Sequence, residues 1–223
     1  MTKNSERRPL KVRELNIMGS IARKLSQSNI TPNQISLMSV LFAFLAANCL
    51  LILPVWQNIW LSWLAALLIQ CRLLCNLFDG MVAMEGGKST PSGELFNDIP
   101  DRVADPLILV AAGYAVAALP FGIELGWLAG LLAVKTAYVR VLAHSIGAPA
   151  LFTGPMAKQH RMAIMTFALF LLPLEMLWFG TLGYCVWVAL LVICLGCCLT
   201  LCRRTRDAYL YLEIAPNKEN KDV

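Results

Sequence analysis

Histidine is nearly absent from this sequence. The few histidines and the positions of the cysteines give little support for zinc sites or disulfide bonds. The 223 residues contain only two histidines, His144 and His160, and neither has the spacing of a metal site. Most of the eight cysteines lie inside apolar runs, where thiols usually pack as small hydrophobic groups. The N-terminal stretch MTKNSERRPLKVRELN carries charge where a secretory signal would be apolar, so we do not expect a cleaved signal peptide.

Apolar residues, in contrast, are abundant. They make up 58% of the chain, against roughly 45–50% in a soluble domain, and the mean hydropathy is +0.62. Several windows approach the roughly 20 apolar residues that cross a bilayer. We therefore predict an all-α polytopic membrane protein, built as one bundle of six transmembrane helices at about 33–54, 60–83, 95–118, 125–146, 159–178 and 181–202.

The two ends of the chain are polar. Residues Lys11 to Ser28 alternate apolar and basic positions at helical spacing, which is typical of an amphipathic helix on an anionic membrane surface; a plain solvated helix is the alternative. Thr31 before Pro32 is a good helix start. The predicted organisation is a cytoplasmic N-terminal segment (1–29), a six-helix membrane domain (30–202) and a cytoplasmic C-terminal tail (203–223).

Lysine and arginine are distributed unequally between the two sets of loops. They gather in the N-terminal segment, in the 84–94 and 147–158 connections and at the C-terminal end. The connections near 55–59, 119–125 and 174–181 contain none. By the positive-inside rule, both termini and the 84–94 and 147–158 connections face the cytoplasm.

One hydrophilic segment interrupts this apolar sequence. NLFDGMVAMEGGKSTPSGELFNDIPDRVAD, Asn76 to Asp105, holds four aspartates and two glutamates where the second and third predicted spans meet. Helical spacing places Asn76 and Asp79 on one face, and Asn97, Asp101 and Asp105 on another. We expect the two helices to be antiparallel neighbours. Ionised carboxylates at a membrane normally indicate function, and oxygen ligands favour Mg²⁺, Mn²⁺ or Ca²⁺.

The same segment resembles the motif of the CDP-alcohol phosphatidyltransferases, D-x-x-D-G-x-x-A-R, eight residues, then G-x-x-x-D-x-x-x-D. This chain reads N-x-x-D-G-x-x-A-M, eight residues, then G-x-x-x-N-x-x-x-D. The matching positions are Asp79, Gly80, Ala83, Gly93 and Asp101. The departures are Asn76 and Asn97 at the first and third acid positions and Met84 at the arginine position. ITPN before the first span, and six spans with cytoplasmic ends, also agree with the family.

The resemblance implies an enzyme that moves a phosphatidyl-type group from a CDP-linked lipid to an alcohol and releases CMP, in phospholipid synthesis. It implies that Asp101 is the catalytic base, and that Asp79 and Asp101, with the carbonyl oxygens of Asn76 and Asn97, hold Mg²⁺ or Mn²⁺. Because two anionic ligands are missing, we expect one firmly bound ion rather than two. The alternative is a member that binds CDP-lipid or lipid as an accessory protein without turnover.

Further residues are candidates for binding substrate. Gly80 and Gly93 leave room for a phosphate, although ordinary tight helix packing explains such glycines equally well, and Ala83 belongs to the same motif. Arg72 and Arg102 could replace the missing motif arginine; Arg102 could instead pair with Asp98 or Asp105. For an anion pocket that receives the acceptor we predict Lys135, Arg140, Lys158 and Arg161, of which Lys158 and Arg161 could equally be positive-inside anchors.

The predicted setting is the bacterial inner membrane, with the active site facing the cytoplasm. The predicted partners are a CDP-linked lipid, an alcohol acceptor that could itself be phosphorylated, the lipid bilayer and a second copy of the chain, and no nucleic acid. Glycerol phosphate, inositol phosphate, serine and a second lipid all stay open as acceptors. A transporter is the third hypothesis, but the acids gather at one side of the membrane rather than at its midplane.

Overall fold

The computed structural model describes residues 16–27, 30–85, 93–180 and 183–219, and every regular element within them is a helix. The prediction of an all-α fold is therefore confirmed. The seven helices are α1 (Asn16–Gln27), α2 (Pro32–Trp56), α3 (Ile59–Glu85), α4 (Gly93–Ala115), α5 (Gly122–Ser145), α6 (Lys158–Phe179) and α7 (Tyr184–Glu219).

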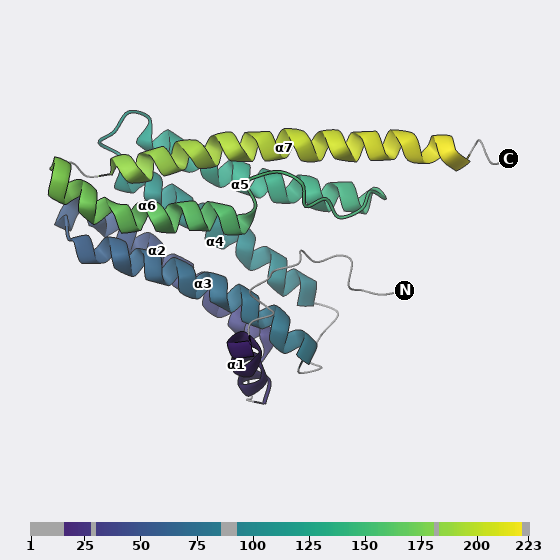
Figure 1. The fold of residues 1–223 in the computed structure, drawn as a ribbon, viewed down its shortest axis with the longest axis horizontal. Helices are drawn as coiled ribbons and strands as arrows, with labels where there is room; N and C mark the ends of the chain where they lie inside the picture. The colour runs from purple at the N-terminus through teal and green to yellow at the C-terminus, as the bar shows by residue number, and fades with distance from the viewer. Residues whose placement is uncertain (1–15, 28–29, 86–92, 181–182, 220–223) are drawn as a thin grey trace.

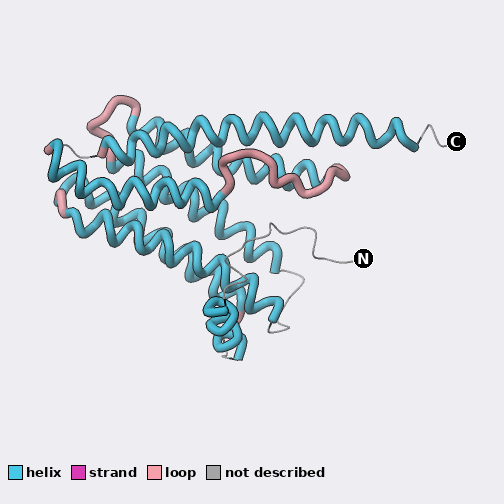
Figure 2. The backbone as a smooth tube through the Cα atoms, in the orientation of Figure 1, coloured by secondary structure: helices cyan, strands magenta, loops and turns pink. Residues whose placement is uncertain are grey.

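Six helices, α2 to α7, run roughly lengthwise in one elongated bundle, whereas α1 lies across one of its ends (Figure 1). The turns from α2 to α3 and from α4 to α5 lie at the opposite end of the bundle. The long connection from α5 to α6 lies on the same side as the C-terminal end of α7 (Figure 2). Alternate connections thus lie at alternate ends, as the charge distribution of the loops predicts.

The first long helix begins where the sequence predicts it. Thr31 is the N-cap of α2: its side chain accepts a hydrogen bond from the backbone N–H of Gln34 (3.3 Å). The side chain of Gln34 in turn accepts from the backbone N–H of Thr31 (3.0 Å). With Pro32 in the first turn, this capping box fixes the point at which the chain enters the bundle.

The core of the bundle is made of small and branched side chains, and α2 is central to it. α2 packs against both α3 and α4, α5 packs against α4 and α7, and α6 packs against α3 and α7. α3 and α4 pack only slightly against each other. The expectation that these two helices are close neighbours therefore holds only at their polar ends, because α2 packs against both of them.

The closest approach between α4 and α5 depends on two glycines. A Cβ atom on Gly126 would lie 2.7 Å from the Cα of Gly113, and one on Gly113 would lie equally close to the Cα of Gly126. Both obstacles are backbone atoms, so a side chain cannot rotate away. The two helices must separate if either residue gains a methyl group.

We expect Gly126→Ala to destabilise the protein by about 1–3 kcal/mol, the usual cost of overpacking. Unfolding in mixed micelles, followed by tryptophan fluorescence, measures the change. Gly19→Ala in α1 is the matched control, because a Cβ there meets nothing within 4 Å. It should leave stability unchanged or raise it slightly. Equal stability of the two variants would contradict the close packing of α4 and α5.

Within the described ranges, five helices are long and apolar enough to cross a membrane, namely α2, α3, α5, α6 and α7, which indicates an integral membrane protein. α4 does not qualify, because its first half carries charged residues. α7 also continues beyond the predicted end of its span at residue 202 as one helix to Glu219, and its last turns project beyond the bundle (Figure 1). The described part of the predicted C-terminal tail is thus helical.

Candidate active site

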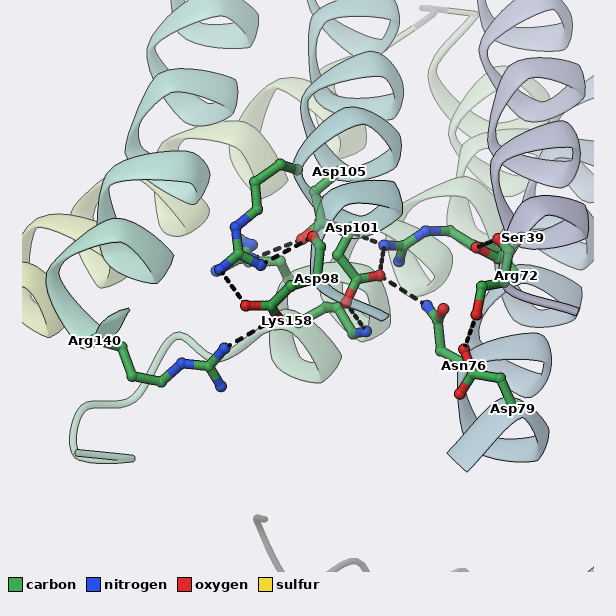
Figure 3. A network of polar contacts seen from close by, with 12 residues as sticks. Ser39, Arg72, Asn76, Asp79, Asp98, Asp101, Asp105, Arg140 and Lys158 are labelled. Atoms are coloured by element: carbon green, nitrogen blue, oxygen red, sulfur yellow. Dashed lines mark hydrogen bonds and ion pairs between the residues drawn. The ribbon is translucent and has the colours of Figure 1, made fainter. Parts of the chain in front are cut away.

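Polar side chains gather where the end of α3 meets the beginning of α4, beside the start of α6. Figure 3 shows Asp98, Asp101 and Asp105 in succession along α4, with Arg140 on one side and Arg72, Asn76 and Asp79 on the other. Their spacing follows the helix, so one turn of α4 separates Asp101 from Asp105. The predicted meeting of acidic helix ends is therefore present.

Asp101 is the centre of this network. Its Oδ1 accepts hydrogen bonds from Arg72 Nη2 and from Asn76 Nδ2, each at 3.0 Å. Its Oδ2 accepts from the Lys158 ammonium group. Two cations and one amide from α3 and α6 thus hold a carboxylate that comes from α4.

Asn76 and Asp79 lie beside Asp101 on α3, three residues apart. Asn76 directs its NH₂ group toward Asp101, because its carbonyl oxygen would be repelled by the carboxylate there. The Oδ2 atom of Asp79 accepts from the Ser36 hydroxyl at 2.6 Å, and Ser36 belongs to α2. This leaves the Oδ1 atoms of Asn76 and Asp79 buried and, within the described residues, without a hydrogen-bond partner.

These two free oxygens bear on the predicted metal. Buried acceptors are rarely left unsatisfied, so these oxygens are candidate positions for a ligand. In the same network, Nε and Nη1 of Arg72 and Nε of Arg161 are also buried without a described hydrogen-bond partner. Carboxylate and amide oxygens are also the donors that Mg²⁺ and Mn²⁺ prefer. The residues thus fit one divalent ion, with Asn76 and Asp79 as ligands. They do not form a rich acidic cage, because no group of three Asp, Glu, His or Cys residues able to hold a metal occurs among the described residues.

A second layer of charge lies deeper in the bundle. Asp105 Oδ2 accepts from Arg161 Nη2 at 2.6 Å, and Asp105 Oδ1 lies 2.6 Å from Arg72 Nη2. Arg161 also donates to the carbonyl oxygen of Met156 (3.2 Å). All three charged side chains are nearly inaccessible to solvent. Because Arg72 contacts both Asp101 and Asp105, this buried layer fixes the position of Asp101.

A third, outer layer forms the rim. Asp98 accepts from Arg102 Nη2 (2.9 Å) and from Arg140 Nη2 (3.3 Å), and the Arg140 guanidinium lies 5.7 Å from the ring centroid of Phe152. Side-chain exposure rises along α4, from 4% at Asp105 to 14% at Asp101 and 39% at Asp98. Asp101 is therefore the carboxylate that is both enclosed and reachable by a substrate.

The start of α6, which carries Lys158, is held by α7. The Thr200 hydroxyl accepts from the backbone N–H of Met156 (2.9 Å), and Arg204 donates to the carbonyl oxygens of Thr153 (3.0 Å) and Thr136 (2.7 Å). Gly154 permits this contact, since a Cβ there would lie 2.6 Å from Thr200 and its φ is +102°. Hydrogen bonds with α7 thus fix the position of the connection that precedes Lys158.

A family model gives this arrangement a name. The model of the CDP-alcohol phosphatidyltransferases matches residues 29–201, which is most of the chain. The chain belongs to this family. Among curated proteins, none matches it significantly.

Several solved structures are similar in fold to this CDP-alcohol phosphatidyltransferase family member. One is the Mycobacterium tuberculosis phosphatidylinositol phosphate synthase PgsA1 in complex with manganese and citrate, with a TM-score of 0.71, 16% identity, and coverage of 86% of this chain and 88% of that one. The same enzyme with CDP-DAG bound gives a TM-score of 0.71, 17% identity and coverage of 87% and 94%. Its apo form gives a TM-score of 0.66 at 16% identity, with coverage of 85% and 95%. At such identities the likeness shows the fold.

The other predicted site residues occupy varied places in this family member. Gly80 and Ala83 follow Asp79 along α3, and Gly93 is the first residue of α4. Asn97 lies on α4, but its side chain is outside the described part of the structure. Lys135 is exposed on α5, and no hydrogen bond or ion pair joins it to the described residues of the site.

Five residues of the network were not among the predicted site residues; one is Asp98, which the sequence named only as a partner for Arg102. Asp105 could have been included, because it continues the four-residue spacing of Asn97 and Asp101. Ser36, Thr136 and Arg204 carry no local pattern that separates them from other polar residues near helix ends. Only the packing of α2, α5 and α7 brings them to the site.

Proposed function

We propose that this protein transfers a phosphatidyl-type group from a CDP-linked lipid to an alcohol acceptor and releases CMP. The observation that carries the proposal is the convergence of Asn76, Asp79 and Asp101 at one end of the bundle. Free oxygen ligands, an enclosed carboxylate and a ring of cations lie together there. PgsA1 with CDP-DAG bound, at 17% identity, supports the substrate class through the shared fold.

In the proposed reaction Asp101 takes the proton from the acceptor hydroxyl. The acceptor oxygen then forms a bond to the lipid-side phosphorus of the pyrophosphate. The bond from that phosphorus to the bridging oxygen breaks, and CMP leaves with the electron pair. A carboxylate within hydrogen-bond reach is suited to this role. Lys158 and Arg72 hold Asp101 in position.

Mg²⁺ or Mn²⁺, held by Asn76 and Asp79, would neutralise charge on the pyrophosphate and orient its phosphorus. Manganese in the PgsA1 complex supports a divalent ion in this fold. Arg102 and Arg140 at the rim pair with Asp98, and in the proposed complex they would release Asp98 and bind a substrate phosphate instead. Lys135, exposed on another face of α5, is the weakest of the proposed anion contacts.

In the proposed membrane arrangement α4 crosses the membrane together with the five candidate spans, which makes six. Both termini are then cytoplasmic, and the site opens to the cytoplasm. α4 can cross despite its charges because Arg72 and Arg161 neutralise Asp105 inside the bundle. We propose a homodimer in the bacterial inner membrane, as the family resemblance implies. The acceptor is an alcohol for which the rim arginines favour a phosphorylated form.

The proposal predicts CMP release that depends on a divalent metal. Purified protein with CDP-diacylglycerol and a panel of alcohols should release CMP, as measured by chromatography. Chelation with EDTA should reduce the rate by at least tenfold, and Mn²⁺ or Mg²⁺ should restore it. Absence of CMP release across wide acceptor and metal panels would remove the proposal.

One observation favours a second function, in which the protein binds CDP-lipid as an accessory protein without turnover. Both oxygens of Asp101 already accept hydrogen bonds from cations, so an acceptor hydroxyl would have to displace one of these groups to reach the carboxylate. This alternative predicts saturable binding of CDP-diacylglycerol, with no CMP release, in wild type and in Asp101→Asn alike.

A further inference from the structure

The three carboxylates on α4 do not need a metal to relieve their repulsion. Asp98, Asp101 and Asp105 each accept an ion pair from at least one arginine or lysine. Counted with Asp79, four carboxylates stand against five cations among the described side chains of the network. The five cations are Arg72, Arg102, Arg140, Lys158 and Arg161. The charge that acidic clusters usually obtain from bound ions is supplied here by the chain itself.

The replacement of metal charge by side-chain cations is clearest at Asp101. Its Oδ2 receives the Lys158 ammonium group, and its Oδ1 receives the Arg72 guanidinium. A divalent ion on Asp101 would have to displace these groups or lie beside two positive charges. Either event is unfavourable, since like charges in a poorly hydrated site repel strongly. Asp101 is therefore closed to a metal as long as Lys158 stays in place.

The amide at position 76 completes the arrangement. Asn76 donates its NH₂ group to Asp101, which an aspartate at this position could not do without protonation. The same side chain leaves its carbonyl oxygen buried and without a described partner, and Asp79 Oδ1, one turn further along α3, is left in the same way. The chain thus has one pair of free oxygens and one carboxylate that its own cations occupy.

We propose that Lys158 and Arg72 replace a second metal ion at Asp101, so that this protein binds a single divalent ion, at Asn76 and Asp79. The proposal rests on the function proposed above and specifies its metal requirement. It assigns Lys158 to the reaction centre as a fixed counter-ion rather than to acceptor binding or membrane anchoring. It also explains why an asparagine can stand at position 76.

The test is a count of bound ions on the full chain in dodecyl maltoside, free of anionic lipid that would itself bind metal. The six-line electron paramagnetic resonance signal of aqueous Mn²⁺ reports free ion, and bound ion follows by difference. Wild type should bind one Mn²⁺ per chain. Lys158→Met, which opens Asp101, should bind a second Mn²⁺ or bind its ion at least tenfold more tightly. Lys158→Arg should behave as wild type.

Lys24→Met is the matched control, because Lys24 is exposed on α1 and lies outside the network; it should bind one ion with wild-type affinity. Two ions or none on wild type would overturn the proposal even if Lys158→Met does not fold. A folded Lys158→Met protein with unchanged count and affinity would also overturn it.

The same samples separate this proposal from the proposed function. Wild type that releases CMP while holding two Mn²⁺ ions would refute the single-ion proposal and leave the transferase intact. Wild type that holds one Mn²⁺ ion and releases no CMP from any acceptor would refute the transferase and leave the ion count intact.

Discussion

Asp101→Asn is expected to slow CMP release by roughly 10²–10⁴-fold, the usual contribution of a general base. The amide is nearly isosteric and can still accept from Arg72, but it cannot take a proton from an alcohol. Lys158, deprived of its carboxylate, also loses its ion pair. The rate of CMP release under saturating CDP-diacylglycerol, Mn²⁺ and acceptor measures the loss.

Asp207→Asn is the matched control, because it makes the same chemical change on α7, outside the described polar network of the site. It should retain the wild-type rate. Binding of CDP-diacylglycerol should survive in both variants, since the proposed metal ligands Asn76 and Asp79 are unchanged. If Asp101→Asn kept more than a tenth of the wild-type rate, another group would have to be the base.

Asp105→Asn is expected to lower the free energy of unfolding by about 3–5 kcal/mol, as is typical when one partner of a buried ion pair is removed. Asp105 faces Arg72 and Arg161, and all three are almost fully buried. Without the carboxylate, two guanidinium groups remain enclosed with too little negative charge. Unfolding in dodecyl maltoside and sodium dodecyl sulfate mixtures, followed by tryptophan fluorescence, gives the free energy.

Asp98→Asn provides the comparison on the same helix. Asp98 also contacts two arginines, but its side chain is 39% exposed. Exposed pairs contribute about 0–1 kcal/mol, so this variant should unfold nearly as wild type does. Combining Asp105→Asn with Arg161→Met should cost less than the sum of the single changes, because the second change removes one of the unpaired charges. Strict additivity would show that the two side chains do not interact.

The sequence predicted the helices better than it predicted their neighbours. Hydropathy and the Thr31–Pro32 start placed α2 to within two residues, because local rules govern helix formation and capping. The position of α2 beside both α3 and α4 was not predicted, since lateral packing depends on shape along whole helices. Gly113 and Gly126 show this: their role becomes visible only once the two backbones are in contact.

For the candidate site, too, the sequence predicted some features and missed others. Motif spacing correctly indicated that Asp79 and Asp101 lie at helix ends that come together. Arg72 was selected because it precedes Asn76 by one turn, and Lys158 because it lies at the start of the fifth predicted span. Their partners could not be assigned. Asp101 was predicted to be a metal ligand. In the structure its Oδ1 accepts from Arg72 and Asn76 and its Oδ2 from Lys158, and the sequence did not indicate these contacts. Such pairing is set by contacts between α3, α4 and α6, which lie far apart in the sequence.

The pairing of Asp105 has a consequence for how the protein is made. Its partner Arg161 lies 56 residues further along the chain, so α4 leaves the ribosome well before that arginine exists. Arg72, already synthesised in α3, is the only one of the two counter-charges available while α4 enters the bilayer. In the proposed topology, α4 would therefore remain beside α3 at the translocon, and release of the half-made bundle into lipid would wait for α6.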